Sequence, residues 1–491
     1  MNTRFAPTLL LAAALSACTL GPDYERPAAP ANGYTKSAQA QSVVYGGAVA
    51  ANWYALFRSR ALDGLVREAL AGNPDLEAAR RGLLAAQNEL TAVGGQALPQ
   101  VQLGTSATRT HANGSFLYEP TQAFNVTANQ FSIGPQLAYN LDIFGGIRRS
   151  IEAQAADTAN SRDQALNTYI TLVDQVVVTA FDYAAAQAQI DVTQSLIHEQ
   201  QDQYELTRKL EDAGKISRGD TLLALTQYET TRASLPALQQ ARDAARNALA
   251  RLCGRTPDQF QMPALALKDF ALPARLPVSL PSALVRQRPD VLAAEDSLHA
   301  ANARIGVATA ARLPSLTISA QYAQQATKLN QLFTQPGGIW SFGVDAATPI
   351  FEGGTLAARE DEAKQLHAQA QAAYRSTVIK AFVEVADALD AVGHGADSYE
   401  AHNRALTAAA EDRELAVAQY RAGKIAELQV LTAEQQYQSA ALSQVQADAQ
   451  RFTDAAELFR SLGGGWWSAP ADPAALPAAP NTHAAAPRAA G

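Results

Sequence analysis

Four segments of the chain alternate between apolar and polar residues: 101–111, 131–143, 313–324 and 339–351. In the second of them, the odd positions are apolar or aromatic, and the even positions carry Ser, Gly, Gln, Ala, Asn and Asp. Alternation over about ten residues is typical of a β-strand with one wet and one apolar face. The pattern fits a membrane barrel with its apolar side outward. The alternative is a soluble sandwich with an apolar interior.

The number of strands limits how such a barrel could form. Four strands cannot close, since small barrels need about eight. An open edge in lipid would leave backbone groups unpaired. A barrel would therefore be shared between chains, and three chains would give 12 strands (3 × 4). The connecting segments 112–130 and 325–338 would then be external loops.

Two long segments without proline follow the paired strands, between Gln136 and Leu235 and between Ile350 and Ala469. Apolar and small residues in both recur at alternating steps of three and four, which is the signature of a coiled coil. A helix of about 65 residues would be roughly 100 Å long at 1.5 Å per residue. The sequence therefore predicts a mixed α and β chain, mostly α, with long coiled-coil helices and four strands.

Two stretches within these segments are copies of one another: 211–228 and 420–437. Gly-Lys-Ile, a Leu, an Ala and Gln-Tyr coincide at a constant offset of 209 residues (423 − 214). Each stretch is a short glycine-centred break between two helical patterns, so we expect two helical hairpin tips in a duplicated protein. Pro74 and Pro289, each followed by Asp, start two matching earlier helices, because proline is favoured in the first helical turn.

The first residues have the pattern of a targeting segment. Arg4 gives a short basic region, and residues 7–17 are apolar but too short to span a bilayer as a helix. The segment ends Leu15-Ser-Ala-Cys18, which fits the lipobox of bacterial lipoproteins, where the cysteine is lipidated. Thr19 follows instead of Asp, which favours an outer-membrane address. The alternative is an ordinary secretory signal in which Cys18 lies by chance.

Composition and charge exclude several other classes. Hydrophobic residues make up 47% of the chain and aromatic residues only 7%, which suits long helices packed on small side chains. A net charge of −8 gives no support to nucleic-acid binding. The seven His show no metal-ligand spacing and no nucleophile–base pair is evident, so we expect no catalytic residue, no metal and no cofactor except a covalent lipid on Cys18. Cys253 is expected to be an inert packed thiol.

Several of these features together resemble the TolC-like outer-membrane efflux proteins. They are the lipobox, the paired strands, Phe144-Gly-Gly and Phe351-Glu-Gly-Gly before the long helices, the duplicated tips and Leu462-Gly-Gly-Gly-Trp. The resemblance covers about residues 15–467 and is strongest to the NodT-like lipoprotein branch that serves RND pumps. It implies a homotrimer with a 12-stranded transmembrane β-barrel in the outer membrane, continued by a helical α-barrel tunnel in the periplasm.

The resemblance also implies a division of the chain and a function. The expected parts are a signal peptide (1–17), a lipidated extended segment (18–60), a first efflux repeat (61–254), an equatorial linker (255–285), a second efflux repeat (286–467) and a disordered Ala/Pro tail (468–491). The expected function is the exit duct of a tripartite pump for small toxic compounds or drugs. Its partners would be a periplasmic adaptor, an inner-membrane RND-type transporter and outer-membrane lipid. The alternatives are a protein-secretion duct of the same architecture and a coiled-coil lipoprotein tether without a pore.

The resemblance places a periplasmic gate at the tips. In the family, a carboxylate six residues after the first tip glycine bonds to a tyrosine three residues before the second. Asp220 and Tyr420 match these positions and form a predicted latch. Gln429 and Thr432 stand where some members carry acidic residues, with Glu427 nearby. The alternative role of Asp220 is to cap the returning helix, because Asp is a favoured N-cap.

The tips are also the expected docking site of the adaptor. The residues that the resemblance assigns to docking are Gly214, Lys215, Ile216, Gly423, Lys424 and Ile425. Some members carry an Arg two residues after the second tip glycine, and this chain has Ile425 there.

Overall fold

The computed structural model describes residues 19–28, 43–47, 49–113, 125–273, 275–279, 281–334 and 336–468. The expected signal peptide, Cys18, the tail from residue 469 and the middle of the first expected loop lie outside these residues. The chain divides into two compact units. The first unit contains residues 1–27, 83–161 and 294–374, and the second contains residues 28–82, 162–293 and 375–491. Each unit therefore draws on both halves of the duplication.

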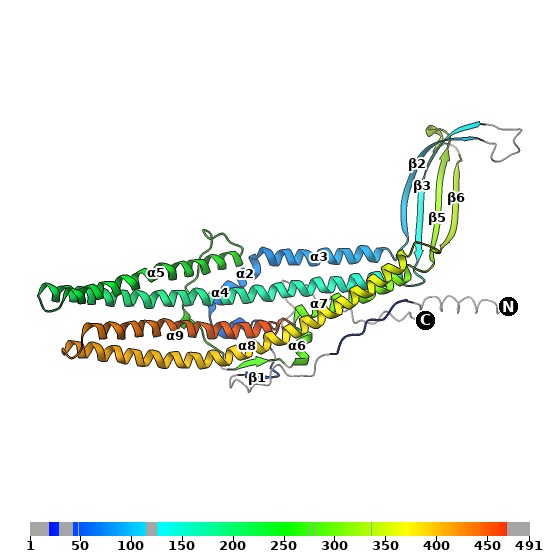
Figure 1. Ribbon diagram of the computed structural model, residues 1–491. Helices are drawn as coiled ribbons and strands as arrows, with labels where there is room; N and C mark the ends of the chain where they lie inside the picture. The colour runs from blue at the N-terminus through cyan, green and yellow to red at the C-terminus, as the bar shows by residue number, and fades with distance from the viewer. Residues whose placement is uncertain are drawn as a thin grey trace. The chain divides into compact units, whose positions relative to one another are not determined.

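The first unit contains a four-stranded antiparallel sheet (Figure 1). The strand order is β2 (Gln100–Asn113), β3 (Asn125–Leu141), β5 (Ser315–Ala326) and β6 (Gly338–Ala347). Leu137 pairs with Val101 on one side and with Ala320 on the other, and Ala320 pairs with Phe342. Directly paired residues share a face of the sheet. The apolar positions of all four strands therefore form one face, as the alternation predicted.

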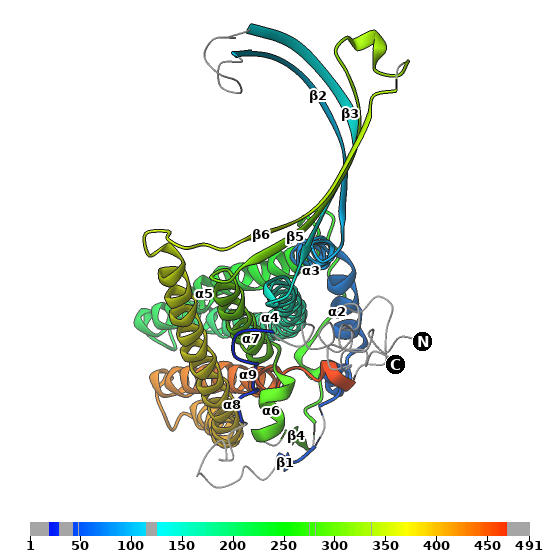
Figure 2. The same ribbon diagram turned by 90° about the vertical axis from the view of Figure 1, so that its right-hand side faces the viewer.

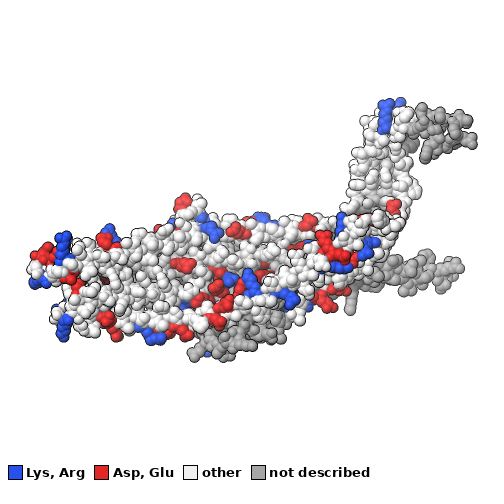
Figure 3. All heavy atoms as spheres, viewed as in Figure 1, with Lys and Arg blue, Asp and Glu red and all other residues white. Residues whose placement is uncertain are grey.

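The apolar face of this sheet is exposed in the single chain. Val101 is 68% exposed, Phe342 65% and Trp340 78%. The four strands carry only two Lys, Arg, Asp or Glu residues, Arg109 and Asp345, and Figure 3 shows a sheet almost free of charged side chains. The strands curve together along their length (Figure 2). A large exposed apolar surface of this kind marks contact with lipid or with another protein.

Two strand ends differ by more than two residues from the sequence prediction. β6 ends at Ala347 and not near residue 351, because Pro349 has no N–H for a ladder hydrogen bond. β3 begins at Asn125, so it includes residues that were expected in a loop. Val126 is at an even position, whereas the apolar residues from Phe131 onward are at odd positions. The alternation is therefore interrupted between them, and the pattern did not predict the first part of the strand.

Four helices form two antiparallel hairpins (Figure 1). They are α4 (Gly146–Asp212) with α5 (Arg218–Leu252), and α8 (Thr355–Arg421) with α9 (Glu427–Ser461). The second hairpin has the bounds of the first shifted by 209 residues (355 − 146, 461 − 252). The shorter helices α3 (Pro74–Gly95) and α7 (Pro289–Ala310) are related by 215 residues (289 − 74). The predicted duplication therefore extends to the individual helix ends.

None of the helices in the described part of the chain is both long enough and apolar enough to cross a membrane.

The segment that follows the expected lipidation site is bound within the first unit. Arg149 on α4 donates hydrogen bonds to the Leu20 carbonyl oxygen at 3.1 Å and to the Asp23 carboxylate at 2.7 Å. A Cβ on Gly21, which has a φ of +94°, would lie 2.5 Å from the Cα of Gly306 on α7. Only glycine permits this approach of the two backbones. The segment is thereby held on α4 and α7.

The apolar core of the second unit is built on aromatic rings. The ring of Phe181 on α4 lies 5.0 Å from that of Phe57, 4.9 Å from Phe270 and 5.4 Å from Phe452, measured between centroids. Such pairs contribute about 0.5–1.5 kcal/mol beyond their buried area. The other elements of this unit are β1 (Val43–Tyr45) paired in parallel with β4 (Leu276–Val278), η1 (Trp53–Phe57), α2 (Arg60–Gly72), η4 (Leu267–Asp269), α6 (Pro281–Gln287) and η6 (Trp466–Ser468).

Candidate functional site at the hairpin tips

The first tip joins α4 to α5 through a sharp turn. Gly214 has a φ of +69°, in the left-handed region that strains any residue with a Cβ. Lys215 N–H donates to the Leu210 carbonyl oxygen at 2.9 Å, so α4 ends in a Schellman motif. Ser217 then caps α5. Its Oγ accepts from Asp220 N–H at 3.3 Å, and Asp220 Oδ2 accepts from Ser217 N–H at 3.1 Å.

This reciprocal pair is a capping box, and it defines what Asp220 does within one chain. The N-cap residue is Ser217, and Asp220 supports it from the third helical position. The alternative prediction that Asp220 is itself the N-cap is therefore wrong, because the N-cap is Ser217, three residues earlier. In the described part of the chain, the Asp220 carboxylate accepts its hydrogen bonds from Ser217 and acts on Tyr420 through its charge. The Asp220–Tyr420 latch remains a prediction.

The second tip repeats the backbone of the first. Gly423 has a φ of +68°, and Lys424 N–H donates to the Gln419 carbonyl oxygen at 2.9 Å. The cap differs, because Ala426 stands in the N-cap position and has no side-chain acceptor. Only half of the box remains, in which Gln429 Oε1 accepts from Ala426 N–H at 2.9 Å.

Glu427, the first residue of α9, is buried within the second unit. It is 3% exposed, and its Oε1 accepts a hydrogen bond from Nε2 of Gln203 on α4 at 2.6 Å. The Tyr420 hydroxyl lies beside the same carboxylate. Burial, followed by a hydrogen bond with Glu427 and then by the charges of Glu427 and Asp220, raises the pKa of Tyr420 to about 12. Glu427 is therefore the stronger acidic neighbour of Tyr420 in the single chain.

The remaining predicted tip residues separate into exposed and packed positions. Ile425 and Tyr420 pack on a small apolar cluster of Ala416, Val430 and Ala433. The glycines and lysines of both tips, and Gln429 and Thr432, are exposed. Figure 3 shows Lys, Arg, Asp and Glu side chains together at the ends of the hairpins. A partner that docks at the tips would therefore meet the lysines and the backbone of the turns.

The sequence prediction did not include Glu434 or Arg413. Glu434 lies on α9 seven residues after Glu427, and burial followed by the Glu427 charge raises its pKa to about 7. Arg413 on α8 opposes this shift, but it pairs with Glu199 on α4 at 2.7 Å. The seven-residue spacing of the two acids is visible in the sequence. Their burial is not, because it depends on α4 and α8.

Comparison with known proteins identifies the family. Residues 65–255 and 280–464 match the family model described as outer membrane efflux protein. The chain belongs to this family.

Relatives cover nearly the whole length of this efflux protein. The probable efflux pump outer membrane protein TtgC of Pseudomonas putida is 31% identical over 458 residues, which cover 92% of this chain and 94% of TtgC. The cation efflux system protein CusC of Escherichia coli is 28% identical over 469 residues, covering 93% of this chain and 97% of CusC. The solved structure of the outer-membrane channel OprN has a TM-score of 0.85 at 29% identity and covers 91% of this chain and 100% of OprN.

These comparisons confirm the resemblance, the fold class and the outer-membrane efflux function that the sequence predicted. The efflux protein is an outer-membrane efflux channel, mostly helical with a few antiparallel strands, and its family is not enzymatic. Among the described residues, no group of three or more His, Cys, Asp or Glu could hold a metal ion. Burial raises the pKa of the Cys253 thiol to about 12, so this thiol stays neutral.

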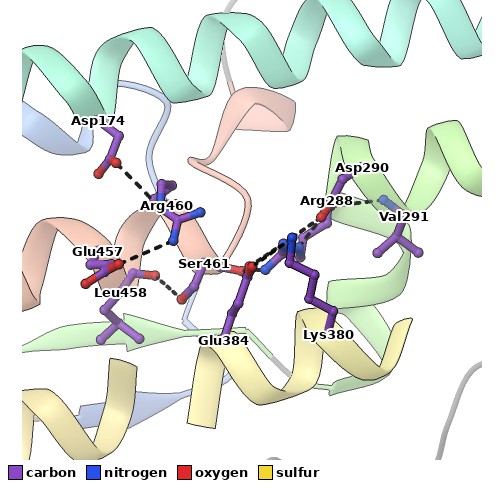
Figure 4. Close-up of polar contacts among 10 residues, drawn as sticks. All are labelled: Asp174, Arg288, Asp290, Val291, Lys380, Glu384, Glu457, Leu458, Arg460 and Ser461. Carbon is purple, nitrogen blue, oxygen red and sulfur yellow. Dashed lines mark hydrogen bonds and ion pairs between the residues drawn. The ribbon is translucent and has the colours of Figure 1, made fainter. Parts of the chain in front are cut away.

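A second polar cluster of the efflux protein surrounds the C-terminal turn of α9 (Figure 4). Arg288 is 5% exposed and donates to Asp290 at 2.7 and 3.0 Å, to Glu384 at 2.6 Å and to the Ser461 carbonyl oxygen at 2.8 Å. A buried guanidinium needs such partners, because an unpaired buried charge is costly. Arg288 thereby connects the start of α7 with α8 and α9.

Arg460 in the same turn faces α4 (Figure 4). It lies 3.5 Å from Asp174 and 3.5 Å from Glu457. Burial raises the pKa of Asp174 to about 7, the charge of Arg460 opposes this shift, and that of Glu457 adds to it. A cavity of about 220 Å³ adjoins the two acids. Arg460 thereby joins α9 to α4 of the first repeat, whereas the partners of Arg288 all lie in the second repeat.

Proposed function

We propose that the efflux protein acts as a homotrimer and forms the exit duct of a tripartite efflux pump, which passes small toxic compounds or drugs from the periplasm to the exterior. The open sheet of the first unit carries this proposal. β2 and β6 are its edges, and four strands are too few to close a barrel. Unpaired edges are costly in lipid, whereas three chains supply 12 strands (3 × 4) with their apolar faces outward.

The remaining parts of the chain have distinct roles in this duct. A covalent lipid on Cys18 anchors the chain in the outer membrane, and the contacts of Arg149 with Leu20 and Asp23 support a fixed position for the segment that follows. The two efflux repeats, 61–254 and 286–467, each supply two strands and one hairpin, with an equatorial linker at 255–285. The efflux-pump names of the relatives support a periplasmic adaptor and an inner-membrane RND-type transporter as partners.

The hairpin tips are the periplasmic gate and the docking site of the adaptor. The exposed Lys215 and Lys424, each next to a turn of the same backbone geometry, support docking at both tips. Asp220 and Tyr420 form the latch of the closed state, and three neighbours line the aperture: Glu427, Gln429 and Thr432.

The first test is the native mass of the lipidated protein in detergent, corrected for bound detergent, followed by conductance in planar bilayers. A trimer that conducts ions supports the duct. A stable, well-folded monomer would rule out the shared barrel and favour a coiled-coil tether. A conducting trimer that exports a protein substrate but no drug would favour the protein-secretion duct.

A matched pair of substitutions tests which face of the sheet meets lipid. Phe342→Lys places a charge on the apolar face, and Ser341→Lys places it on the other face of the same strand. A lysine facing lipid costs about 2–4 kcal/mol at mid-membrane. We expect Phe342→Lys to reduce the amount of inserted trimer and Ser341→Lys to leave it near the unsubstituted level. The reverse result would place the apolar face inside.

A further inference from the structure

The second hairpin carries two acids on α9 that the first hairpin lacks. Glu427 and Glu434 are seven residues apart, two helical turns, and so lie on the same face of the helix. At the offset of 209 residues, the equivalent positions on α5 hold Arg218 and Leu225. The fold of a hairpin therefore does not require these carboxylates, and their presence needs another explanation.

The two carboxylates differ in their partners. Gln203 donates to Oε1 of Glu427, and the Tyr420 hydroxyl lies beside the same carboxylate. The buried Oε2 of Glu434 has no hydrogen-bond partner among the described residues. A buried acceptor without a partner carries a desolvation cost that grows when it is charged. The cation in reach, Arg413, is engaged by Glu199 at 2.7 Å and lies 4.3 Å from the centre of the Tyr437 ring.

Charged and titratable groups from each neighbouring helix face this pair. Glu199 on α4 and Arg413 on α8 act on Glu434, and Tyr420 on α8 lies beside Glu427. Asp220, in the first turn of α5, acts on Tyr420. Burial and then the charge of Glu427 raise the pKa of Glu434 from its ordinary 4.5 to about 7, with a smaller increase from Glu199, and Arg413 only partly opposes them. A protonated carboxyl would lose its charge and gain an O–H donor.

We propose that Glu434 is a proton-operated lock of the second hairpin tip: it is protonated while α9 packs on α4 and α8, and loss of that proton loosens the packing. The step is the dissociation of one proton from the carboxyl group to water, and it needs no other reactant. This inference rests on the proposed gate at the tips and makes its opening pH-dependent. The second tip separates more readily at alkaline than at mildly acidic pH.

The direction follows from the linkage of protonation to folding. A carboxyl group with a raised pKa in the packed state binds its proton more tightly there than in the open state. The stabilisation is fully present below pH 4.5 and is lost as the pH rises through about 7. For a group with these two values, the equilibrium between packed and open states changes about tenfold between pH 6 and pH 8.

Hydrogen exchange of the full-length protein in detergent tests the lock directly. The measured quantity is the protection of amides 427–437, corrected for the intrinsic pH dependence of exchange, with amides 218–228 of the first tip as the internal reference. We expect about tenfold stronger protection of the second tip at pH 6 than at pH 8, and no such change in the first. Equal protection at both pH values would overturn the proposal.

Three variants assign the effect to Glu434. Glu434→Gln keeps the shape without the charge and should protect the tip equally at both pH values. Glu434→Leu, the residue type of the first repeat, should do the same and serves if the glutamine variant folds poorly. Glu414→Gln removes an exposed acid of α8 and should keep the wild-type pH dependence. Retention of the wild-type pH dependence by both Glu434 variants would refute the lock.

Exchange does not depend on conductance, so the two proposals fail separately. A protein that shows the exchange effect but forms no conducting trimer keeps the lock and loses the duct. A conducting trimer with no pH-dependent exchange keeps the duct and loses the lock.

Discussion

At the first tip, α5 begins with Ser217 and Asp220 bonded to each other at an exposed turn, whereas at the second, α9 begins with Ala426 and a buried Glu427. The glycine of each turn nevertheless has nearly the same φ, +69° and +68°. Duplication has therefore retained the residues that shape the backbone, while the residues that stabilise the helix start have changed. One tip is stabilised by its own cap, and the other depends on contacts with α4 and α8.

Among substitutions at the two tips, those that break the predicted latch should have the largest effect on the gate equilibrium. Asp220→Ala with Tyr420→Phe removes one hydrogen bond to a charged group, worth about 1.5–3 kcal/mol, or about tenfold or more in the gate equilibrium. We expect intact trimers that admit more of a bulky antibiotic, measured by its uptake in cells with normal expression.

A control variant distinguishes the loss of the latch from the loss of the helix cap. Ser217→Ala breaks the capping box but leaves Asp220 and Tyr420 in place. If Ser217→Ala admits as much antibiotic as the double variant, the leak comes from the lost cap and the latch hypothesis fails.

The tip glycines should be equally sensitive despite their different surroundings. A Cβ on Gly214 or Gly423 would meet no atom within 4 Å, so alanine is opposed only by the left-handed backbone. Each Gly→Ala variant should cost about 1–2 kcal/mol of local stability, measured by hydrogen exchange at its own tip. Gly64→Ala, within α2, without a positive φ and with no atom within 4 Å of the added Cβ, is the control and should not destabilise either tip. A large difference between the two tips would show that their backbones are not equivalent.

The missing cap of the second tip can be restored. Ala426→Ser supplies the acceptor that Ser217 provides in the first tip, and should stabilise the start of α9 by about 0.5–1 kcal/mol. The readout is amide protection at residues 427–430, with Ala422→Ser, before the turn, as a control without a cap to complete. Unchanged protection in Ala426→Ser would mean that buried contacts, and not the cap, limit this helix start.

The smallest effect is expected from Glu427→Gln, which should shift the pH dependence of the second tip. Glu427→Gln keeps a side-chain oxygen for Gln203 but removes a charge that raises the pKa of Glu434. The pKa of Glu434 should move toward 4.5 and stay above it, because burial is the larger cause. The pH range in which the second tip loses protection should therefore move down, as followed by hydrogen exchange over pH 5–8. An upward shift would contradict this assignment of charges.

Local pattern was sufficient for most of the fold. The 3.5-residue repeat and the glycine-centred breaks gave both hairpins, and the alternation gave all four strands of the sheet. The alternation was misleading at two strand ends. At Val126 the apolar residues change from odd to even positions, although the strand continues. At Pro349 the apolar alternation continues, although the strand has already ended at Ala347. Asp220 was assigned correctly to the start of α5, but Ser217, three residues earlier, is the cap.

The duplication, the helix ends and the family could be predicted from the amino-acid sequence, because glycine turns, prolines and periodic apolar positions act on neighbouring residues. The burial of particular acids and the pairing of particular cations could not be predicted, because they arise from tertiary contacts. Gln203 and Glu427 are 224 residues apart, and Arg413 and Glu199 are 214 apart. Desolvation and pairing depend on such distant neighbours, so the same glutamate can be a solvated surface charge or a proton-binding group inside the tip.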